Sequence, residues 1–244
     1  MAVCDASDAN ANAGPRPTEA AATDHPDRRG RAARGLFVVL EGPEGSGKTT
    51  QVGLLVDWLE AEGIPSLRVR EPGGTPEGEQ IRRVILESGH VPARAELLLL
   101  LAARAILVEE RIRPALEAGM VVVADRYTLS SLAYQGYGRG LGAAVVDELN
   151  DFATGGLRPD LTVLLDVPAE LGEARRRQAG FADDRIEQAG REFHRRVVEA
   201  YRLLAQDRPD IVVLDGTGSV DEVQREVRRL LARLFPETFP SGEG

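Results

Sequence analysis

One stretch of the sequence, residues 36–51, constrains the fold of this chain more than any other. It begins with the apolar run LFVVL and continues as GPEGSGKT, the spacing G-x-x-x-x-G-K-[ST] of a phosphate-binding loop between a buried strand and a helix. Glycines let the backbone approach a polyphosphate closely because they carry no Cβ. The N–H groups of the loop and the start of the helix attract the anion. The pattern therefore predicts a nucleoside triphosphate site.

Individual residues of this loop have distinct chemical roles. Lys48 places a point charge beside the outer phosphates, and the hydroxyl of Thr49 is a ligand for Mg²⁺. Lys48 is the only lysine among 30 basic residues, so a chain that otherwise uses arginine has a compact ammonium at this one position. The predicted ATP-binding residues are Gly42, Pro43, Glu44, Gly45, Ser46, Gly47, Lys48, Thr49 and Thr50.

The composition excludes several classes of protein. A formal net charge of −9 argues against a general nucleic-acid or anionic-membrane binder, because no basic excess attracts phosphate. The single cysteine excludes a disulfide framework and a cysteine metal site. No apolar run approaches the length of a membrane span. We therefore expect a soluble, cytoplasmic protein without nucleic-acid or membrane partners.

The two ends of the chain differ from its middle. Residues 1–34 have no apolar periodicity and contain five acidic residues and five arginines, so they predict a disordered tail. An extended gene-start assignment would look the same. Residues 236–244 form a second polar tail, which leaves residues 35–235 as one domain.

Strand and helix patterns alternate through this domain. Short apolar segments predict buried strands at 36–40, 120–124 and 161–165, and two further short strands are predicted at 67–70 and 211–214. Helical periodicity is found at 48–62, 76–87, 93–118, 143–152, from 168, at 186–206 and at 220–235. This alternation predicts an α/β fold with a five-stranded parallel sheet, right-handed crossovers and helices on both faces.

Polar residues directly follow two of the expected strands, at the carboxyl ends where open α/β sheets bind ligands. The strand ending at Arg70 leads into EPGGT, a tight loop, and the apolar run before Asp125 leads into Arg126. An acidic residue in the position of Asp125 usually holds Mg²⁺ beside a phosphate loop, although it could instead cap a helix. The segment 130–140, SSLAYQGYGRG, suits a pocket lining more than a core.

Three adjacent arginines, residues 175–177, precede a glycine-containing segment that extends to about residue 187. Such a run is commonly a solvated helix face. Beside a nucleotide site it could instead belong to a mobile lid that brings charge to the phosphates.

The distribution of arginines also indicates the type of reaction. No water-positioning residue of a hydrolase and no γ-phosphate-sensing loop of a switch is evident. Arg70, Arg104 and Arg126 instead follow three separate elements that should converge near the loop. A phosphate acceptor is already ionised and needs no general base, whereas bringing two polyanions together needs bidentate cations. The pattern favours a nucleoside monophosphate kinase.

Several motifs in order resemble one family of such kinases. They are EGPEGSGKTTQ (41–51), REPGGT (70–75), AAR (102–104), DRY (125–127), AYQG (133–136), RPD (158–160) and DRIE (184–187). Together they resemble thymidylate kinase over residues 36 to about 235. The resemblance implies the nucleoside monophosphate kinase fold, a homodimer, Mg²⁺-ATP as donor, and phosphorylation of dTMP to dTDP in dTTP synthesis.

The resemblance also implies roles for particular residues around the acceptor phosphate and sugar. Glu44 would lie near the deoxyribose 3′-hydroxyl, Arg70 and Arg126 would hold the dTMP phosphate, and Tyr134 would pack against the sugar. The phosphate loop has no arginine at Ser46, which is similar to a bacterial subtype that supplies the catalytic arginine from the lid. The implied catalytic residues are Glu44, Lys48, Asp125, Arg126, Arg175, Arg176 and Arg177, and the implied metal ligands are Thr49 and Asp125.

On the base side, the resemblance implies that Arg104 contacts thymine and that Ser131 and Gln135 line its pocket. One position departs from the family pattern. Four residues before the arginine of AAR the family usually has a phenylalanine that stacks on thymine, and this chain has Leu100. Two other functions stay open: a kinase for another deoxynucleoside monophosphate, and a phosphate-loop nucleotide-binding protein without turnover.

Overall fold

Five short strands form one parallel sheet in the order β2-β3-β1-β4-β5. The computed structural model describes residues 34–180, 185–206 and 208–239, so most of both predicted tails and residues 181–184 of the predicted lid lie outside the described residues. The strands are β1 Phe37–Glu41, β2 Ser66–Arg70, β3 Val121–Asp125, β4 Leu161–Asp166 and β5 Ile211–Asp215. The predicted five-stranded parallel sheet is therefore confirmed.

The strand order places the phosphate loop at the middle of one edge of the sheet. Strand β1 lies between β3 and β4, because the chain first adds β2 and β3 on one side of β1 and then crosses to add β4 and β5 on the other. Leu40 of β1 and Arg70 of β2 are both in register with Asp125 of β3. The carboxyl ends of these strands meet at a topological switch point, where open α/β sheets have their ligand crevice.

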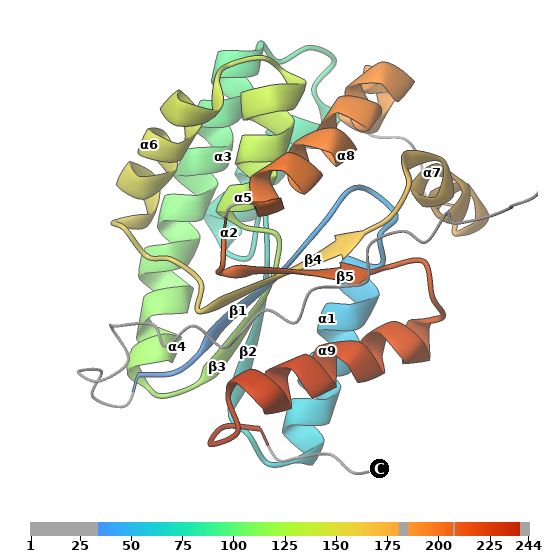
Figure 1. Cartoon of the computed structure of the whole chain (residues 1–244). Coiled ribbons are helices and arrows are strands. Elements are labelled where there is room, and N and C mark those ends of the chain that lie inside the picture. The colour runs from blue at the N-terminus through green and yellow to red at the C-terminus, as the bar shows by residue number, and fades with distance from the viewer. Residues whose placement is uncertain (1–33, 181–184, 207, 240–244) are drawn as a thin grey trace, which may run out of the picture. The chain divides into compact units, whose positions relative to one another are not determined.

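Helices cover both faces of the sheet, as predicted (Figure 1). Helices α1 and α9 pack on one face, and α3, α6 and α8 lie on the other. The helices are α1 Lys48–Ala61, α2 Pro76–Glu87, α3 Ala93–Leu107, α4 Arg113–Glu117, α5 Thr128–Ser131, α6 Ala143–Thr154, α7 Ala169–Gln178, α8 Arg191–Gln206 and α9 Val220–Leu234.

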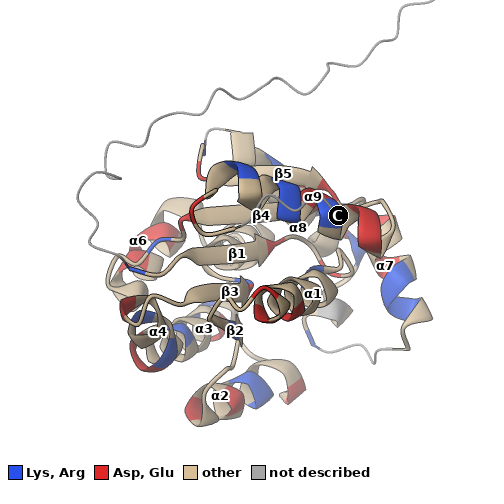
Figure 2. Cartoon of the chain, turned by 90° about the horizontal axis from the view of Figure 1, so that it is seen from below, with Lys and Arg blue, Asp and Glu red and all other residues tan. Residues whose placement is uncertain are grey.

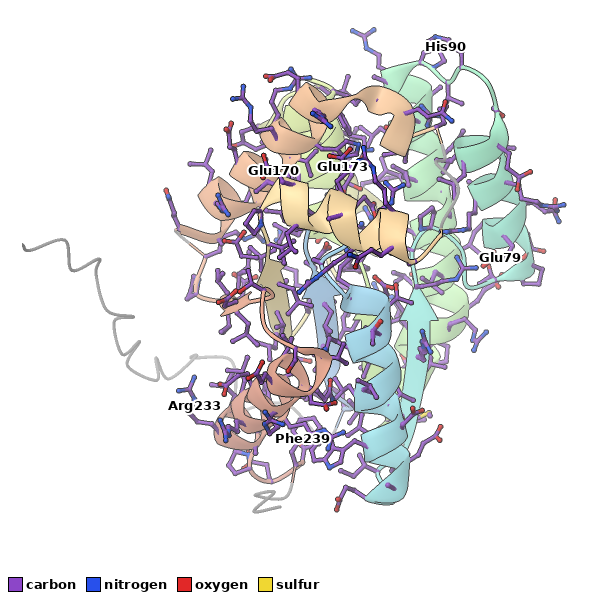
Figure 3. All side chains as sticks on the ribbon, turned by 90° about the vertical axis from the view of Figure 1, so that its right-hand side faces the viewer. Glu79, His90, Glu170, Glu173, Arg233 and Phe239 are labelled. Carbon is purple, nitrogen blue, oxygen red and sulfur yellow. The ribbon has the colours of Figure 1, made fainter. Side chains whose placement is uncertain are left out.

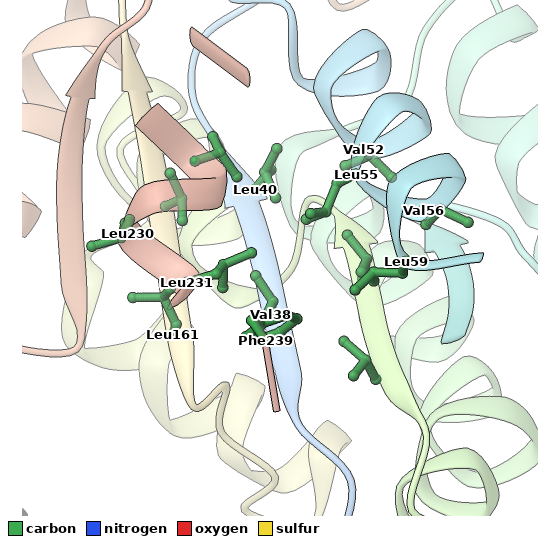
Figure 4. Close-up of a cluster of buried hydrophobic side chains, with 14 of the residues drawn as sticks. Val38, Leu40, Val52, Leu55, Val56, Leu59, Leu161, Leu230, Leu231 and Phe239 are labelled. Atoms are coloured by element: carbon green, nitrogen blue, oxygen red, sulfur yellow. The ribbon is translucent and has the colours of Figure 1, made fainter. Parts of the chain in front are cut away.

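Successive side chains of the central strand β1 point to opposite faces of the sheet and pack into two separate hydrophobic cores. Val38 and Leu40 of β1 point to the α1 and α9 side, while Phe37 and Val39 point to the opposite face. The first core is seen in Figure 4, where α1 contributes an i, i+3, i+4, i+7 stripe and the chain returns beyond α9 with Phe239. The members of that α1 stripe are Val52, Leu55, Val56 and Leu59.

The structure corrects two predicted helices and adds helical structure to a segment for which none was predicted. The helix predicted over 93–118 contains a π-helical stretch, Val108–Ile112, just before Pro114, which has no N–H to donate to the preceding turn. Residues 130–140 are largely helical, because α5 continues into a second π-helical stretch, Leu132–Gly138. The helix predicted over 186–206 begins only at Arg191, since Gly190 has φ 91° and interrupts it.

Candidate active site

Three glycines give the phosphate loop its curved backbone, in conformations that residues with a side chain rarely adopt. Gly42, Gly45 and Gly47 have φ of 146°, 71° and 93°. A Cβ on Gly42 would lie 2.6 Å from the carbonyl oxygen of Leu165. Gly47 precedes α1 and no side chain caps that helix, so its first N–H groups are available to an anion. The loop has the form of an anion site.

The side chain of Lys48 lies across the phosphate loop. Its Nζ donates to the carbonyl oxygen of Pro43 at 2.8 Å and to Oγ of Ser46 at 3.2 Å. Burial, with the nearby positive charge of Arg126, lowers the pKa of Lys48 to about 8. The ammonium is therefore held close to the position of the phosphates, in a setting where an added anion would stabilise its charge.

This pKa leads to a pH-dependence prediction. Below pH 8 the free protein already carries the Lys48 proton, whereas above pH 8 it must take up a proton when a polyphosphate binds. We expect ATP affinity to fall by as much as roughly tenfold per pH unit above about 8. Titration calorimetry at pH 7 and pH 9, in buffers of different ionisation enthalpy, measures this uptake. A constant affinity without proton uptake would contradict the prediction.

The predicted metal ligands lie together beside the loop. Oγ1 of Thr49, in the first turn of α1, donates to Oδ2 of Asp125 at 2.5 Å. Helix α5, which follows Asp125, has no side-chain cap, so the alternative of a helix cap is not observed. A hydroxyl and a carboxylate are ligands that suit Mg²⁺. Within the described ranges no group of three or more His, Cys, Asp or Glu residues could hold a metal ion, so a magnesium ion here would depend on phosphate oxygens as well.

Arg126, which was predicted to hold the acceptor phosphate, directly follows β3. It has φ 75°, a left-handed conformation that is costly for any residue other than glycine and that clusters at functional sites. Its guanidinium stacks over the ring of Tyr134 at 5.1 Å and pairs with Glu44 at 2.6 Å. Its other acceptors are the carbonyl oxygen of Gly42, Oγ of Ser130 and the hydroxyls of Tyr134 and Tyr201.

Glu44, the acidic residue inside the phosphate loop, is ionised in this arrangement. Its partial burial opposes the charge, but Arg126, Lys48, the Tyr134 hydroxyl and Arg176 outweigh it and lower the pKa to about 2. The same contacts do not deprotonate Tyr134, because burial raises the pKa of its phenol. The structure thus brings Glu44, Lys48, Arg126 and Tyr134 into one electrostatic cluster.

The base-side residues lie between two helical segments. Arg104 of α3 is 2% exposed, and its five N–H groups all reach protein acceptors. These acceptors are the carboxylate of Glu71, Oγ of Ser131, Oδ1 of Asn150 and the carbonyl oxygen of Tyr127. In this arrangement Arg104 joins α3 to Glu71, Ser131 and Asn150, and its predicted contact with the base stays a prediction.

Leu100 lies one helical turn before Arg104 and is buried, with 9% exposure. Its neighbours Leu97 and Leu101 belong to the core shared by α3, α5 and α8, whereas Leu100 is in none of the three core clusters formed by the described residues. This placement is typical of a side chain that lines a pocket.

Arg70 is not brought to the phosphate loop. Its Nη2 donates to both carboxylate oxygens of Glu79 on α2, to Oε1 at 2.9 Å and to Oε2 at 2.8 Å. The Arg70 side chain is 42% exposed. Figure 3 labels Glu79 on α2. The role of Arg70 in binding the acceptor phosphate stays a prediction.

The three predicted lid arginines, in the last turn of α7, have different surroundings. Figure 2 shows basic residues gathered on this helix. Arg175 donates to the carbonyl oxygens of Gly216, Thr217 and Gly218, after β5. Arg177 pairs with Glu173 of its own helix and is 69% exposed. Arg176 is the one whose charge acts on Glu44 of the phosphate loop.

Helix α7 lies directly on the phosphate loop. A Cβ on Gly45 would lie 2.2 Å from the carbonyl oxygen of Gly172, and a Cβ on Gly172 would lie 2.2 Å from that of Glu44. Figure 3 shows α7, marked by Glu170 and Glu173, over the start of α1. The backbone contact therefore places the first half of α7 against the phosphate loop, and the arginine turn follows it.

Sequence reasoning missed three buried carboxylates that organise the site. Glu41 accepts from the N–H groups of Tyr127 and Ser130 and from the hydroxyls of Ser130 and Tyr201. Glu71 pairs with Arg104, and Glu96 binds Gln135, Arg139 and Arg185. The available signal was an acid directly beside an apolar run, after it for Glu41 and before it for Glu96, because such groups are buried only when paired.

None of the helices in the described part of the chain is both long and apolar enough to cross a membrane.

Comparison with known proteins gives a consistent result. The family described as thymidylate kinase matches residues 40–227. The chain is 51% identical over 202 residues to a thymidylate kinase of Synechococcus sp., covering 82% of this chain and 96% of that protein. It is 47% identical over 192 residues to that of Fervidobacterium nodosum (79% and 96% covered) and 46% identical over 207 residues to that of Symbiobacterium thermophilum (84% and 96% covered).

Proposed function

Because this chain belongs to the thymidylate kinase family, we propose that it transfers the γ-phosphoryl group of ATP to dTMP, giving dTDP and ADP. The observation that carries the proposal is the contact between Arg126, which follows β3, and Glu44 inside the phosphate loop. This pair joins a cation suited to an acceptor phosphate to the loop that holds the donor.

The geometry supports direct transfer between two phosphates. Lys48 and the N–H groups of the loop hold the donor, and Arg126 offers its guanidinium to the acceptor phosphate, which needs no general base. Glu44 is then released from Arg126 and can accept a hydrogen bond from the 3′-hydroxyl of the sugar. Thr49 and Asp125 would hold Mg²⁺, which when bound neutralises charge on the donor phosphates.

An acceptor panel tests this function. The protein is incubated with Mg²⁺-ATP and one acceptor at a time, and ADP release is measured. The acceptors are dTMP, dUMP, dCMP, dGMP and the ribonucleotide ribothymidine monophosphate. Fastest release with dTMP supports the proposal. A preference for another deoxynucleotide would indicate a different monophosphate kinase, and ATP binding without turnover on any acceptor would indicate a nucleotide-binding protein.

We predict that Arg176 is the lid arginine with the largest effect on turnover. Arg176→Ala should lower kcat roughly tenfold or more with little change in the dTMP KM, because the charge acts mainly on the transferring phosphoryl group. Arg177→Ala is the matched control, and its kcat should stay within about twofold, since Arg177 faces solvent and Glu173. A larger loss in the Arg177 variant would show that the lid is arranged differently.

Leu100→Phe should tighten dTMP binding several-fold. A phenylalanine adds an aromatic surface for the base, worth roughly 0.5–1.5 kcal/mol beyond area burial. Calorimetric titration with dTMP measures the gain. Leu101→Phe is the control, because Leu101 belongs to the core and a larger side chain there should only destabilise the protein. Weaker dTMP binding and a lower Tm in the Leu100 variant would mean that Leu100 is itself a core residue.

We also propose that the protein is a cytoplasmic homodimer. Apolar side chains are exposed on α3 and α6, including Leu98 at 61%, Val145 at 54% and Phe152 at 87%. Helices α3 and α6 are neighbours in the fold, so these side chains could form one interface. Sedimentation of the protein at micromolar concentration distinguishes a dimer from a monomer.

A further inference from the structure

Two facing helical segments are joined by polar contacts at both ends of the proposed base pocket. Helix α3 carries Glu96, Leu100 and Arg104 at successive i, i+4 positions, so the three share one face. Opposite them, Ser131 and Gln135 are also four residues apart. Nη1 of Arg104 donates to Oγ of Ser131 at 3.0 Å, and Nε2 of Gln135 donates to Oε1 of Glu96 at 2.8 Å. Leu100 lies between these two contacts.

Glu96 is a fully buried carboxylate with two cationic partners. It is 0% exposed, and it accepts from Nη2 of Arg185 at 2.6 Å and from Nε and Nη2 of Arg139 at 3.3 Å. Burial alone would raise its pKa, but the Gln135 contact and the two arginines lower it below the ordinary value. Glu96 is therefore ionised, and an ionised carboxylate only accepts hydrogen bonds.

This property determines the orientation of the Gln135 amide. Because Glu96 accepts only, the NH₂ group of Gln135 must face it, and the carbonyl Oε1 must point to the other side. Gln135 is 2% exposed, and its Oε1 forms no hydrogen bond with any described residue. This Oε1 is not among the fully buried unpaired side-chain atoms of the described residues, so it keeps some open surface and is available to a ligand that supplies a donor.

We propose that Glu96 is a specificity-determining positioning residue, which holds Gln135 so that an oxygen acceptor faces the acceptor base. The inference rests on the proposed function and deepens it. Thymine and uracil have an N3–H donor that matches this acceptor. Cytosine has an unprotonated N3 in the same place, so two acceptors would face each other and the mismatch would be left buried.

The test replaces the acceptor-only carboxylate by a group that both donates and accepts. In Glu96→Gln, the amide of Gln135 can turn and present its NH₂ group to the base. We expect the ratio of kcat/KM for dTMP over dCMP to fall roughly tenfold or more, the scale of one unsatisfied buried polar group. The ratio for dTMP over dUMP should stay within about twofold, because both bases carry N3–H.

A matched control separates the effect of changing the charge around Glu96 from the effect of turning the Gln135 amide. Arg139→Gln removes one cation from the same carboxylate but leaves the contact between Glu96 and Gln135, so both ratios should stay near those of the unmodified protein. If Glu96→Gln alone folds poorly because two arginines lose their partner, the double variant with Arg139→Gln reduces the excess charge and should show the same fall in the dTMP over dCMP ratio.

The outcomes distinguish this inference from the proposed function. An unmodified protein that fails to phosphorylate dTMP overturns the proposed function. Normal dTMP activity together with an unchanged dTMP over dCMP ratio in both Glu96 variants overturns the role of Glu96. Equal losses for dTMP, dUMP and dCMP would make Glu96 a purely structural residue and would also overturn it.

Discussion

Replacing Lys48 by alanine should lower kcat by roughly 10²- to 10³-fold or more while the protein stays folded. The ammonium lies across the phosphate loop, and its charge is needed most when negative charge moves between donor and acceptor. The structural cost is small, because only two hydrogen bonds inside the loop are lost, each worth about 1 kcal/mol. Steady-state turnover with dTMP and a urea unfolding curve measure the two effects.

Two controls sharpen the Lys48 test. Lys48→Arg keeps the charge but replaces a compact ammonium by a longer, planar group, so we expect it to stay strongly impaired. Arg68→Ala removes an exposed cation whose Nη2 contacts the carbonyl oxygen of Thr49 at 3.4 Å, and its turnover should change less than about twofold. Near-normal turnover by a folded Lys48→Ala protein would contradict the assignment of the phosphate loop.

Replacing Arg126 should reduce kcat/KM for dTMP by roughly 10²- to 10³-fold. The guanidinium donates hydrogen bonds to Glu44 and also to the hydroxyls of Ser130 and Tyr201, so it joins the phosphate loop to the residues beyond β3. Its loss removes the cation proposed for the acceptor phosphate and leaves the Glu44 carboxylate beside it without its main partner. Initial rates over a range of dTMP and ATP concentrations measure the change.

The unusual backbone of Arg126 supplies the matched control. At φ 75°, glycine is unstrained, whereas alanine keeps the strain. Arg126→Gly and Arg126→Ala should therefore lose activity equally, while the glycine variant is more stable by about 1 kcal/mol. An effect confined to the ATP KM, or substantial activity in the glycine variant, would show that Arg126 does not hold the acceptor.

The sequence predicted the sheet correctly and placed the phosphate loop between a strand and a helix, because both depend on local patterns. Apolar segments of four or five residues separated by helical periodicity are enough to indicate a parallel sheet. The loop around Lys48 and Thr49 is a continuous motif, and the structure places Asp125 beside it. The ends of helices were predicted less accurately. The apolar spacing predicted a helix from residue 186, whereas the helix begins after Gly190.

What the tertiary structure alone decided is the pairing of charges across the site. Glu44 and Arg126 are 82 residues apart, Gln135 and Glu96 are 39 apart, and Arg104 and Glu71 are 33 apart. The sequence has 30 basic and 39 acidic residues, and periodicity does not indicate which of them meet. Nor does it separate three adjacent arginines, of which one acts on Glu44, one contacts the loop after β5 and one faces solvent. Local sequence determines the elements, but these pairings depend on how the elements pack, because a buried charge takes whichever partner the fold brings within hydrogen-bond distance.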